Sequence, residues 1–247
     1  MPEKSTIEQV CIMAGKMMLE SGAETYRVED TMDRIAKAYG VENPQSYASL
    51  TEINFSTGLT HKNSFIRITK RETNLHKVDD LNRISRQIAD GKLRPEQAIQ
   101  EFEQIEEHSI AFPIWIQLAA SGLASGSFAV MFGGTPPDFL PALLAGMIGY
   151  AAMIALSLLF EVRFLSEFFA SFLLAIAAYV FIRYGVGNEM DKVIIGAVMP
   201  LVPGLHITNA IRDLMLGHLI AGLSKGIETV LTSCAIGAGV AMLFAFV

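Results

Sequence analysis

Residues 112–132 read FPIWIQLAASGLASGSFAVMF, a run that contains no charged side chain. A helix rises about 1.5 Å per residue, so about 20 apolar residues are enough to cross the hydrocarbon core of a bilayer. Trp115 stands near the start of the run, where aromatic side chains commonly anchor a span at the membrane interface. The stretch therefore predicts a transmembrane helix.

Four more apolar runs follow, separated by short loops such as GGTPPD at residues 133–138. Small residues within the runs, among them Gly237 and Gly239, allow neighbouring helices to approach closely. We therefore predict an all-α transmembrane bundle of about five helices, with the fourth broken at Pro200 and Pro203. The predicted spans of this transmembrane domain, residues 112–247, are 112–132, 139–160, 164–182, 193–216 and 226–247.

Charge is divided unevenly along the 247 residues, whose net charge is −6. About 29 % of residues 1–111 are charged, with 14 Lys/Arg and 18 Asp/Glu, against about 9 % of residues 112–247. So few charges in the second half argue against a wholly soluble enzyme, and two cysteines are too few for a disulfide scaffold. Neither half has a basic stripe, so no nucleic-acid partner is expected.

Residues 1–111 predict a small α+β domain. Apolar residues recur at helical spacing in four segments, and strand-like stretches lie near residues 47–56 and 64–70, with a turn expected at residues 60–63. The first residues lack the pattern of a signal peptide, so the domain is expected in the cytosol. Its histidines do not have the spacing of metal ligands, and we predict no catalytic residue, metal or cofactor.

One segment of this domain, GAETYRVED at residues 22–30, places two acids around an arginine at the start of a helix. Acidic side chains suit the positive end of a helix dipole. Glu24, Arg27 and Glu29 are therefore interpreted in one of two ways. They belong to a capped surface helix with local ion pairs, or they form a cytosolic contact for a substrate or regulator.

The fourth apolar run contains GAVMPLVPGLHITNAIRD at residues 196–213. Proline has no backbone N–H to donate, so Pro200 and Pro203, followed by Gly204, should break a helix. At membrane depth such a break persists only against protein or beside a water-filled cavity. Many transporters present broken spans of this kind to their solutes. We therefore expect Pro200, Pro203 and Gly204 to shape a substrate-binding site.

Polar side chains follow the break directly. Asn209, Arg212 and Asp213 are spaced three and four residues apart, so they share one helical face. Arg212 is expected to anchor a carboxylate, which Thr208 and Asn209 orient. The alternative is a proline kink with Arg212 and Asp213 paired at the cytosolic interface. The candidates for proton coupling are Asp213, His206 and Glu228.

Charges at the ends of the spans indicate the orientation. With the N-terminal domain inside, the loops at 133–138 and 183–192 hold two Lys/Arg outside, whereas those at 161–163 and 212–225 hold three inside. This bias agrees with a cytosolic N-terminus. Two charged pairs are expected to be local ion pairs: Lys225 with Glu228, and Glu161 with Arg163.

The chain resembles the threonine/serine exporter family in its split form. The resemblance covers nearly the whole chain and rests on GAETYRVE at residues 22–29, five spans, and PLVPG at residues 200–204 followed by Asn209 and Arg212. It implies export of threonine and serine in some members and of dicarboxylates such as succinate in others. It also implies a separate small membrane protein that supplies a second transporter half.

An odd number of spans is an independent reason to expect that partner, because an inverted repeat needs a counterpart of opposite orientation. We therefore predict a subunit of a proton-linked secondary exporter of small carboxylate-bearing metabolites, of the threonine/serine type, in the inner cell membrane. A dicarboxylate exporter subunit is an alternative, because an arginine suits both solutes. A membrane-anchored enzyme or sensor with its active site in residues 1–111 is another.

Overall fold

The structure is a computed structural model that describes residues 4–58, 63–107, 112–160 and 162–246. The chain divides into two compact units. The N-terminal unit comprises Met1–Ile110 together with Leu205–Gly226, and the membrane unit comprises Ala111–Gly204 together with Ile227–Val247. Residues 205–226, which follow the predicted break, therefore group with the N-terminal domain, an association that the sequence did not suggest.

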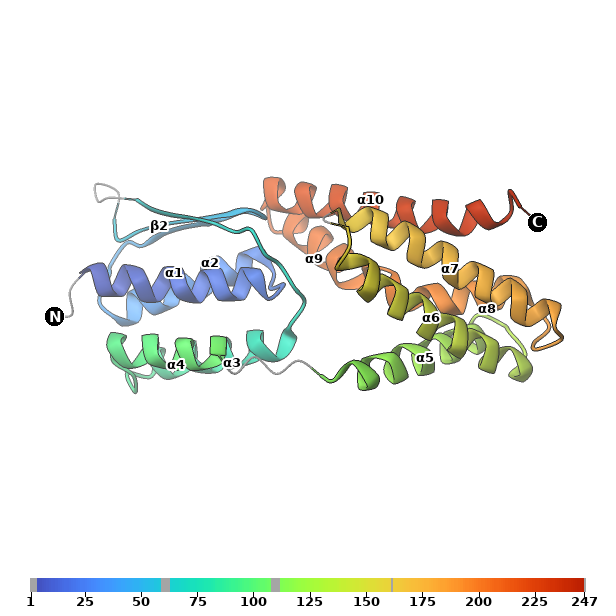
Figure 1. Cartoon of the computed structure of the whole chain (residues 1–247). Helices are drawn as coiled ribbons and strands as arrows, with labels where there is room; N and C mark the ends of the chain where they lie inside the picture. Colours follow the sequence, from blue (N-terminus) through green and yellow to red (C-terminus); the bar gives the residue numbers. More distant parts are fainter. Residues whose placement is uncertain (1–3, 59–62, 108–111, 161, 247) are drawn as a thin grey trace. The chain divides into compact units, whose positions relative to one another are not determined.

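The N-terminal unit is built in three layers (Figure 1), in which a pair of central helices lies between a small sheet and a second pair of helices. The central helices are α1 (Lys4–Glu20) and α2 (Thr25–Ala38), and the outer helices are α3 (Leu75–Ala89) and α4 (Pro95–Glu107). The apolar face of α1 is buried from Ile7 to Leu19, where it packs on its neighbours in the unit. The four helices therefore follow the helical periodicity of the sequence.

The sheet has three antiparallel strands, β1 (Gln45–Ala48), β2 (Glu52–Ser56) and β3 (Ser64–Arg67), paired in that order. The sequence predicted one strand over residues 47–56, and this prediction was wrong. The chain turns between β1 and β2, where the Ser49 N–H donates to the Glu52 carbonyl at 2.9 Å. The β2–β3 pairing is present, and most of the turn predicted at residues 60–63 lies outside the described residues.

The membrane unit contains α5 (Ile114–Met131), the short 3-10 helix η1 (Pro136–Asp138), α6 (Phe139–Ser157) and α7 (Arg163–Arg183). These are followed by α8 (Met190–Val198) and η2 (Met199–Leu201). Two further helices come after the break: α9 (Gly204–Met215) lies almost wholly in the N-terminal unit, and α10 (Leu219–Leu243) belongs to the membrane unit from Ile227 onward.

The described residues include four helices long and apolar enough to cross a membrane, or five spans if the bent pair Met190–Leu201 and Gly204–Met215 counts as one. The four helices, α5, α6, α7 and α10, correspond to the first, second, third and fifth predicted spans. The bent pair corresponds to the fourth. The chain is therefore a mostly helical, multi-pass membrane protein with a small soluble-type domain.

Glycine allows close packing inside the membrane unit. A Cβ atom at Gly146 of α6 would collide with the Ser125 hydroxyl of α5, and one at Gly239 of α10 would collide with the Phe168 carbonyl oxygen of α7. In a bilayer, where lipid gives no hydrophobic drive between helices, such close approach supplies the dispersion contacts that hold them together.

Candidate functional site

The helix of the fourth apolar run is interrupted where the prolines predict it. It ends at Leu201, Val202 takes an extended conformation, and a new helix begins at Gly204. Pro200 lies in the terminal 3-10 turn, and its missing N–H removes one helical hydrogen bond. The residues after the break, which carry the predicted polar cluster, pack in the N-terminal unit.

The beginning of α2 meets α9 at a sharp turn. The chain leaves α1 through Gly22, whose φ of +85° is readily adopted only by glycine. This turn leaves the Gly22 carbonyl available, and the Asn209 side-chain amide donates to it at 3.1 Å. The predicted solute-orienting residue Asn209 is therefore bound to backbone of the segment GAETYRVED.

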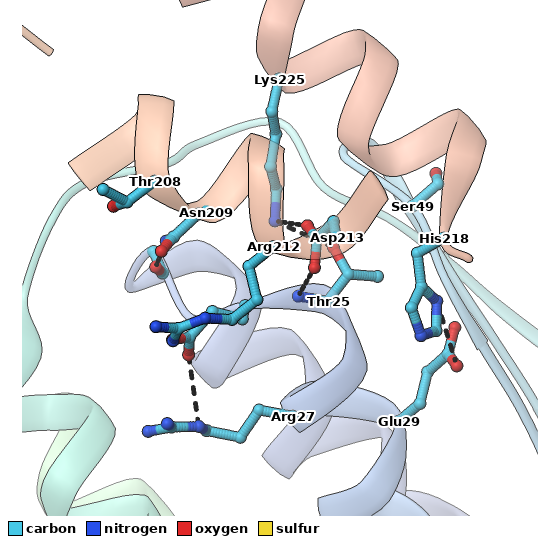
Figure 2. A network of polar contacts seen from close by, with 12 residues as sticks. Thr25, Arg27, Glu29, Ser49, Thr208, Asn209, Arg212, Asp213, His218 and Lys225 are labelled. Carbon is cyan, nitrogen blue, oxygen red and sulfur yellow. Dashed lines mark hydrogen bonds and ion pairs between the residues drawn. The ribbon is translucent and has the colours of Figure 1, made fainter. Parts of the chain in front are cut away.

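Three buried side chains form the centre of this contact (Figure 2). The Thr25 N–H and hydroxyl donate to the two carboxylate oxygens of Asp213 at 3.1 and 2.9 Å. The Lys225 ammonium donates to Asp213 Oδ2 at 2.7 Å and to the Thr25 hydroxyl at 2.9 Å. Asp213 and Thr25 are fully buried. A buried charge is tolerated when it is paired and hydrogen-bonded, and both conditions hold here.

Two arginines, Arg212 and Arg27, lie at the rim of the same contact and bind one glutamate. The Arg212 guanidinium binds Glu24 Oε1, and Arg27 binds Glu24 Oε2 at 3.2 Å, so one carboxylate is shared between two cations. The Arg212 side chain is 51 % exposed, whereas that of Glu24 is 12 % exposed. Arg212 therefore keeps donor groups that face solvent while Glu24 holds one side of it.

Glu29 and His218 form a second, weaker contact between α2 and the loop after α9. The His218 Nδ1 atom lies 3.6 Å from Glu29 Oε2, and the Ala48 N–H donates to Glu29 Oε1 at 2.8 Å. Burial raises the pKa of Glu29, and the Ala48 hydrogen bond and the neighbouring His218 oppose that rise. Glu29 therefore links the sheet, α2 and the segment 216–218.

The structure thus brings together Asn209, Arg212 and Asp213 with Glu24 and Glu29, which the sequence singled out in two separate regions. The other predicted residues lie elsewhere. The Thr208 hydroxyl donates to the Leu205 carbonyl of its own helix at 3.0 Å. His206 lines a small pocket of about 30 Å³, beside Gly22, Asn209 and Lys225, which has room for about one water molecule. Glu228 lies in the membrane unit.

Sequence reasoning missed two members of this network, Thr25 and Lys225. The sequence suggested Glu228 as the partner of Lys225, because they are three residues apart, but the Lys225 ammonium reaches Asp213 in the structure. Burial of the pair is the reason: a carboxylate sealed from water requires a cation close by. The sequence feature that could have indicated this pair is that Lys225 and Asp213 are both ionisable residues in apolar surroundings.

A groove in the membrane unit lies beside Pro200. It has a volume of about 480 Å³ and is lined by Gln117, Ser121 and Tyr150 as well as apolar side chains. The Tyr150 hydroxyl donates to the Gln117 side-chain carbonyl at 3.0 Å. Polar side chains on α5 and α6 therefore accompany the break, although sequence reasoning did not select Gln117 or Tyr150. The sequence feature that could have indicated these two residues is a polar side chain inside an otherwise apolar run.

No group of three or more His, Cys, Asp or Glu side chains in the described parts of the chain could hold a metal ion. The N-terminal unit offers ion-paired and hydrogen-bonded groups on α2 and α9, and the membrane unit offers a broken apolar span with a groove beside Pro200. In a multi-pass helical protein, such a combination is typical of a transporter. The apolar helices and the broken span therefore indicate a membrane transport protein.

Comparison with known proteins identifies the group to which it belongs. The sequence profile of the threonine/serine exporter family matches residues 9–247, so the chain is a member of that family. It is 23 % identical over 240 residues to the threonine/serine exporter of Corynebacterium glutamicum, covering 92 % of this chain and 48 % of that protein. A probable threonine/serine exporter of Mycobacterium tuberculosis is 24 % identical, with 87 % and 41 % covered.

A second kind of relative is matched over nearly its whole length. The probable succinate transporter subunit YjjP of Klebsiella aerogenes is 25 % identical over 252 residues, covering 97 % of this chain and 93 % of that protein. The chain thus spans about half the length of the exporters it matches and nearly all of the subunit. No solved structure shows significant similarity to it.

Proposed function

We propose that this chain is one subunit of a secondary exporter of small carboxylate-bearing metabolites, of the threonine/serine type. The observation that carries the proposal is the pattern of coverage: the chain matches half of each exporter named above but almost all of a protein named as a transporter subunit. A separate small membrane protein then supplies the remaining half. The assembly lies in the inner membrane, with the N-terminal unit in the cytosol.

In this proposal the break after Leu201 forms one wall of the solute pathway. Pro200, Pro203 and Gly204 keep the chain from continuing as a helix, so backbone groups near the break are available to a polar solute. The groove beside Pro200, with the Gln117 and Tyr150 side chains, offers neutral hydrogen-bonding groups of the same kind. Its volume of about 480 Å³ lies within the range of small-molecule sites.

Arg212 receives the solute carboxylate. Its guanidinium already binds a carboxylate, that of Glu24, and about half of the side chain is exposed. A solute carboxylate would take the place of Glu24, which keeps its second ion pair with Arg27. Thr208 and Asn209 lie on the same helix and orient the solute. Because the adjacent pocket admits only about one water molecule, α9 must move away from α2 when the solute binds.

Proton coupling is the remaining part of the proposal. Asp213, His206 and Glu228 are its candidates among the residues near the break and α10. Asp213 is already bound by Thr25 and Lys225, so a proton added to it would weaken the contact that holds α9 against α2. Such a step would connect proton binding to the movement of α9.

A dicarboxylate is the second candidate solute. It is favoured by the two relatives that match this chain over nearly their whole length, from Klebsiella aerogenes and Escherichia coli, which are both named as probable succinate transporter subunits. Arg212 suits the carboxylate of an amino acid and that of succinate equally well. The choice between an amino acid and a dicarboxylate depends on which protein groups contact the end of the solute that Arg212 does not bind.

The test is efflux of radiolabelled threonine, serine and succinate from cells that carry this chain with its candidate second half, or either protein alone. We expect efflux of at least one solute only when both proteins are present. Arg212→Ala should abolish that efflux, whereas Arg183→Ala, which removes an exposed arginine at the end of α7, should not. Efflux unchanged by Arg212→Ala would reject the anchoring role.

The variant Glu24→Gln tests whether Glu24 competes with the solute for Arg212 or only holds Arg212 in place. If Glu24 competes with the solute, removing its charge should lower the solute concentration required for half-maximal efflux. If Glu24 only holds Arg212 in place, the same change should raise that concentration. Glu42→Gln, an exposed acid in the same unit, serves as the matched control.

A further inference from the structure

Helix α7 carries a buried acid that plays no part in the contacts described so far. Glu167 is 2 % exposed, and its Oε1 accepts from Arg163 Nε at 2.8 Å. Its second oxygen, Oε2, has no hydrogen-bond partner among the described residues. An ionised carboxylate has acceptor sites on both oxygens, so half of this group is sealed from water without compensation.

A second acid approaches the same arginine from α10. Glu228 Oε1 lies 4.0 Å from Arg163 Nη1, and its side chain is partly exposed. One guanidinium thus lies within ion-pair distance of two carboxylates. The sequence suggested Glu161 as the partner of Arg163, but Glu161 lies outside the described residues.

The described residues beside Glu167 in this Arg163–Glu167–Glu228 cluster are mostly uncharged, and Lys225, three residues before Glu228 on α10, is paired with Asp213. Ser166 beside Glu167 is buried, as are Thr229 and Thr232 on α10. The exposed thiol of Cys234 lies further along α10. The remaining described charged residues of the membrane unit lie at the opposite end of α7 or in the loops there: Asp138, Arg183, Glu189, Asp191 and Lys192.

We infer that Glu167, in place of the candidates Asp213, His206 and Glu228 taken from the sequence, is the proton-carrying residue of the exporter. Arg163 moves between Glu167 and Glu228 as the proton binds and leaves. This inference rests on the proposed transport function and assigns its coupling to a residue that the sequence did not indicate. A proton from water on one side of the membrane adds to Oε2 and forms an O–H bond. The same proton later leaves to water on the other side.

Burial gives the physical reason. A proton on Glu167 removes the charge of a carboxylate that is sealed from water, in a medium where charge is costly. A neutral carboxyl with an unpaired O–H also costs less in an apolar site than a carboxylate with an unpaired oxygen. Once Glu167 is neutral, Arg163 is attracted more strongly by Glu228.

The packing of α7 against α10 gives this exchange a mechanical consequence. Arg163 at the start of α7 pairs with Glu228 of α10. Later in both helices, Gly239 of α10 fits closely against Phe168 and Ser171 of α7. The two helices therefore run in the same direction. Transfer of Arg163 from its own helix to Glu228 strengthens the connection between α7 and α10, so the proton alters which helices are held together.

The test compares two modes of transport in vesicles that contain the full chain and its second half. Exchange of labelled for unlabelled solute at equal pH needs no net proton movement, whereas accumulation driven by a pH gradient does. Glu167→Gln should retain exchange of threonine, serine or succinate, whichever the wild type carries. It should reduce gradient-driven accumulation by about tenfold or more, because an amide binds no proton. Asp191→Asn, an exposed acid at the other end of the unit, should leave both modes unchanged.

Three outcomes would overturn the inference. If Glu167→Gln retains normal gradient-driven accumulation, another residue carries the proton. If the variant loses both modes of transport at a normal protein level, the role of Glu167 is structural. If this variant does not accumulate in the membrane, Glu167→Asp replaces it, and a pH profile of net transport identical to wild type rejects the role. A wild type that shows neither mode with any of the three solutes rejects the proposed function itself.

Discussion

The hydroxyl of Thr25 donates a hydrogen bond of 2.9 Å to Asp213, which stands 188 positions later in the chain. Both side chains are fully buried, and Lys225 completes the contact by donating to both of them. The segment GAETYRVED and the helix after the broken span are therefore parts of one folding unit. Three expected outcomes follow from this contact and its neighbours, and a fourth follows from the packing of α7 against α10.

Thr25→Val removes the hydroxyl and preserves the shape of the side chain. Asp213 loses an accepted hydrogen bond and Lys225 loses an acceptor, so the variant should lose about 1–3 kcal/mol of stability. Thermal unfolding of the full chain in detergent measures the change. Thr25→Ser, which keeps the hydroxyl, should remain close to wild type, and equal losses in both variants would contradict the role of this hydrogen bond.

Asp213→Asn removes one charge of a buried pair and leaves Lys225 uncompensated. A loss of about 3–5 kcal/mol is expected for breaking a buried ion pair in this way. The double variant Asp213→Asn with Lys225→Met should recover part of the loss, because it leaves no unpaired charge.

Unfolding of the single and double variants in the same detergent gives the comparison. Asp90→Asn, in an exposed pair with Lys92, is the control and should stay close to wild type. A double variant less stable than Asp213→Asn alone would show that Lys225 is not held there by Asp213.

Gly239→Ala should destabilise the membrane unit, because the added methyl group meets the Ser171 hydroxyl and the Phe168 carbonyl oxygen. Overpacking of this kind costs about 1–3 kcal/mol. Gly237→Ala is the matched control on the same helix, since among the described residues no atom beyond its own stretch of helix lies within 4 Å of its added Cβ. The control should be neutral or slightly stabilising, as alanine favours helix more than glycine does. Melting temperatures that fall equally would argue against close packing of α7 and α10.

Stability should depend on pH through Glu29. Burial raises the pKa of this carboxyl above its usual value of 4.5. A carboxyl whose pKa is higher in the folded state stabilises the fold fully below its unfolded pKa, and that contribution is lost as pH rises through the folded value. Glu29→Gln does not titrate, so its melting temperature should fall less than that of wild type as the pH is raised above about 4.5. Glu42→Gln should keep the wild-type slope, and an unchanged slope in Glu29→Gln would contradict the assignment.

Much of the architecture was predictable because it depends on local properties of the chain. Apolar length alone located the spans now seen as α5, α6, α7 and α10, and two prolines located the interruption before Gly204. The split between β1 and β2 was not predictable from alternation, because Ser49 and Thr51 continue the strand-like pattern through a turn. Hydropathy also could not show that residues 205–226 fold with the N-terminal domain.

The candidate site was predictable only by residue type. Arg212 and Asp213 stood out as ionisable groups beside an apolar run, but their partners Glu24, Thr25 and Lys225 depend on contacts between distant segments. Glu167 was overlooked for the same reason, since a carboxylate at the end of an apolar run looks solvated until packing shows that it is sealed.

The sequence by itself determined where this chain can enter a membrane and where its helix must break. Placing a charge or an unpaired backbone group in lipid is costly, and whether a segment carries such groups depends on its own residues alone. Only the tertiary structure decided which charges pair, because a buried ion takes the nearest cation in space, whatever its distance along the chain. That rule joins Asp213 to Lys225, and Thr25 adds a neutral hydrogen-bond donor from a distant segment.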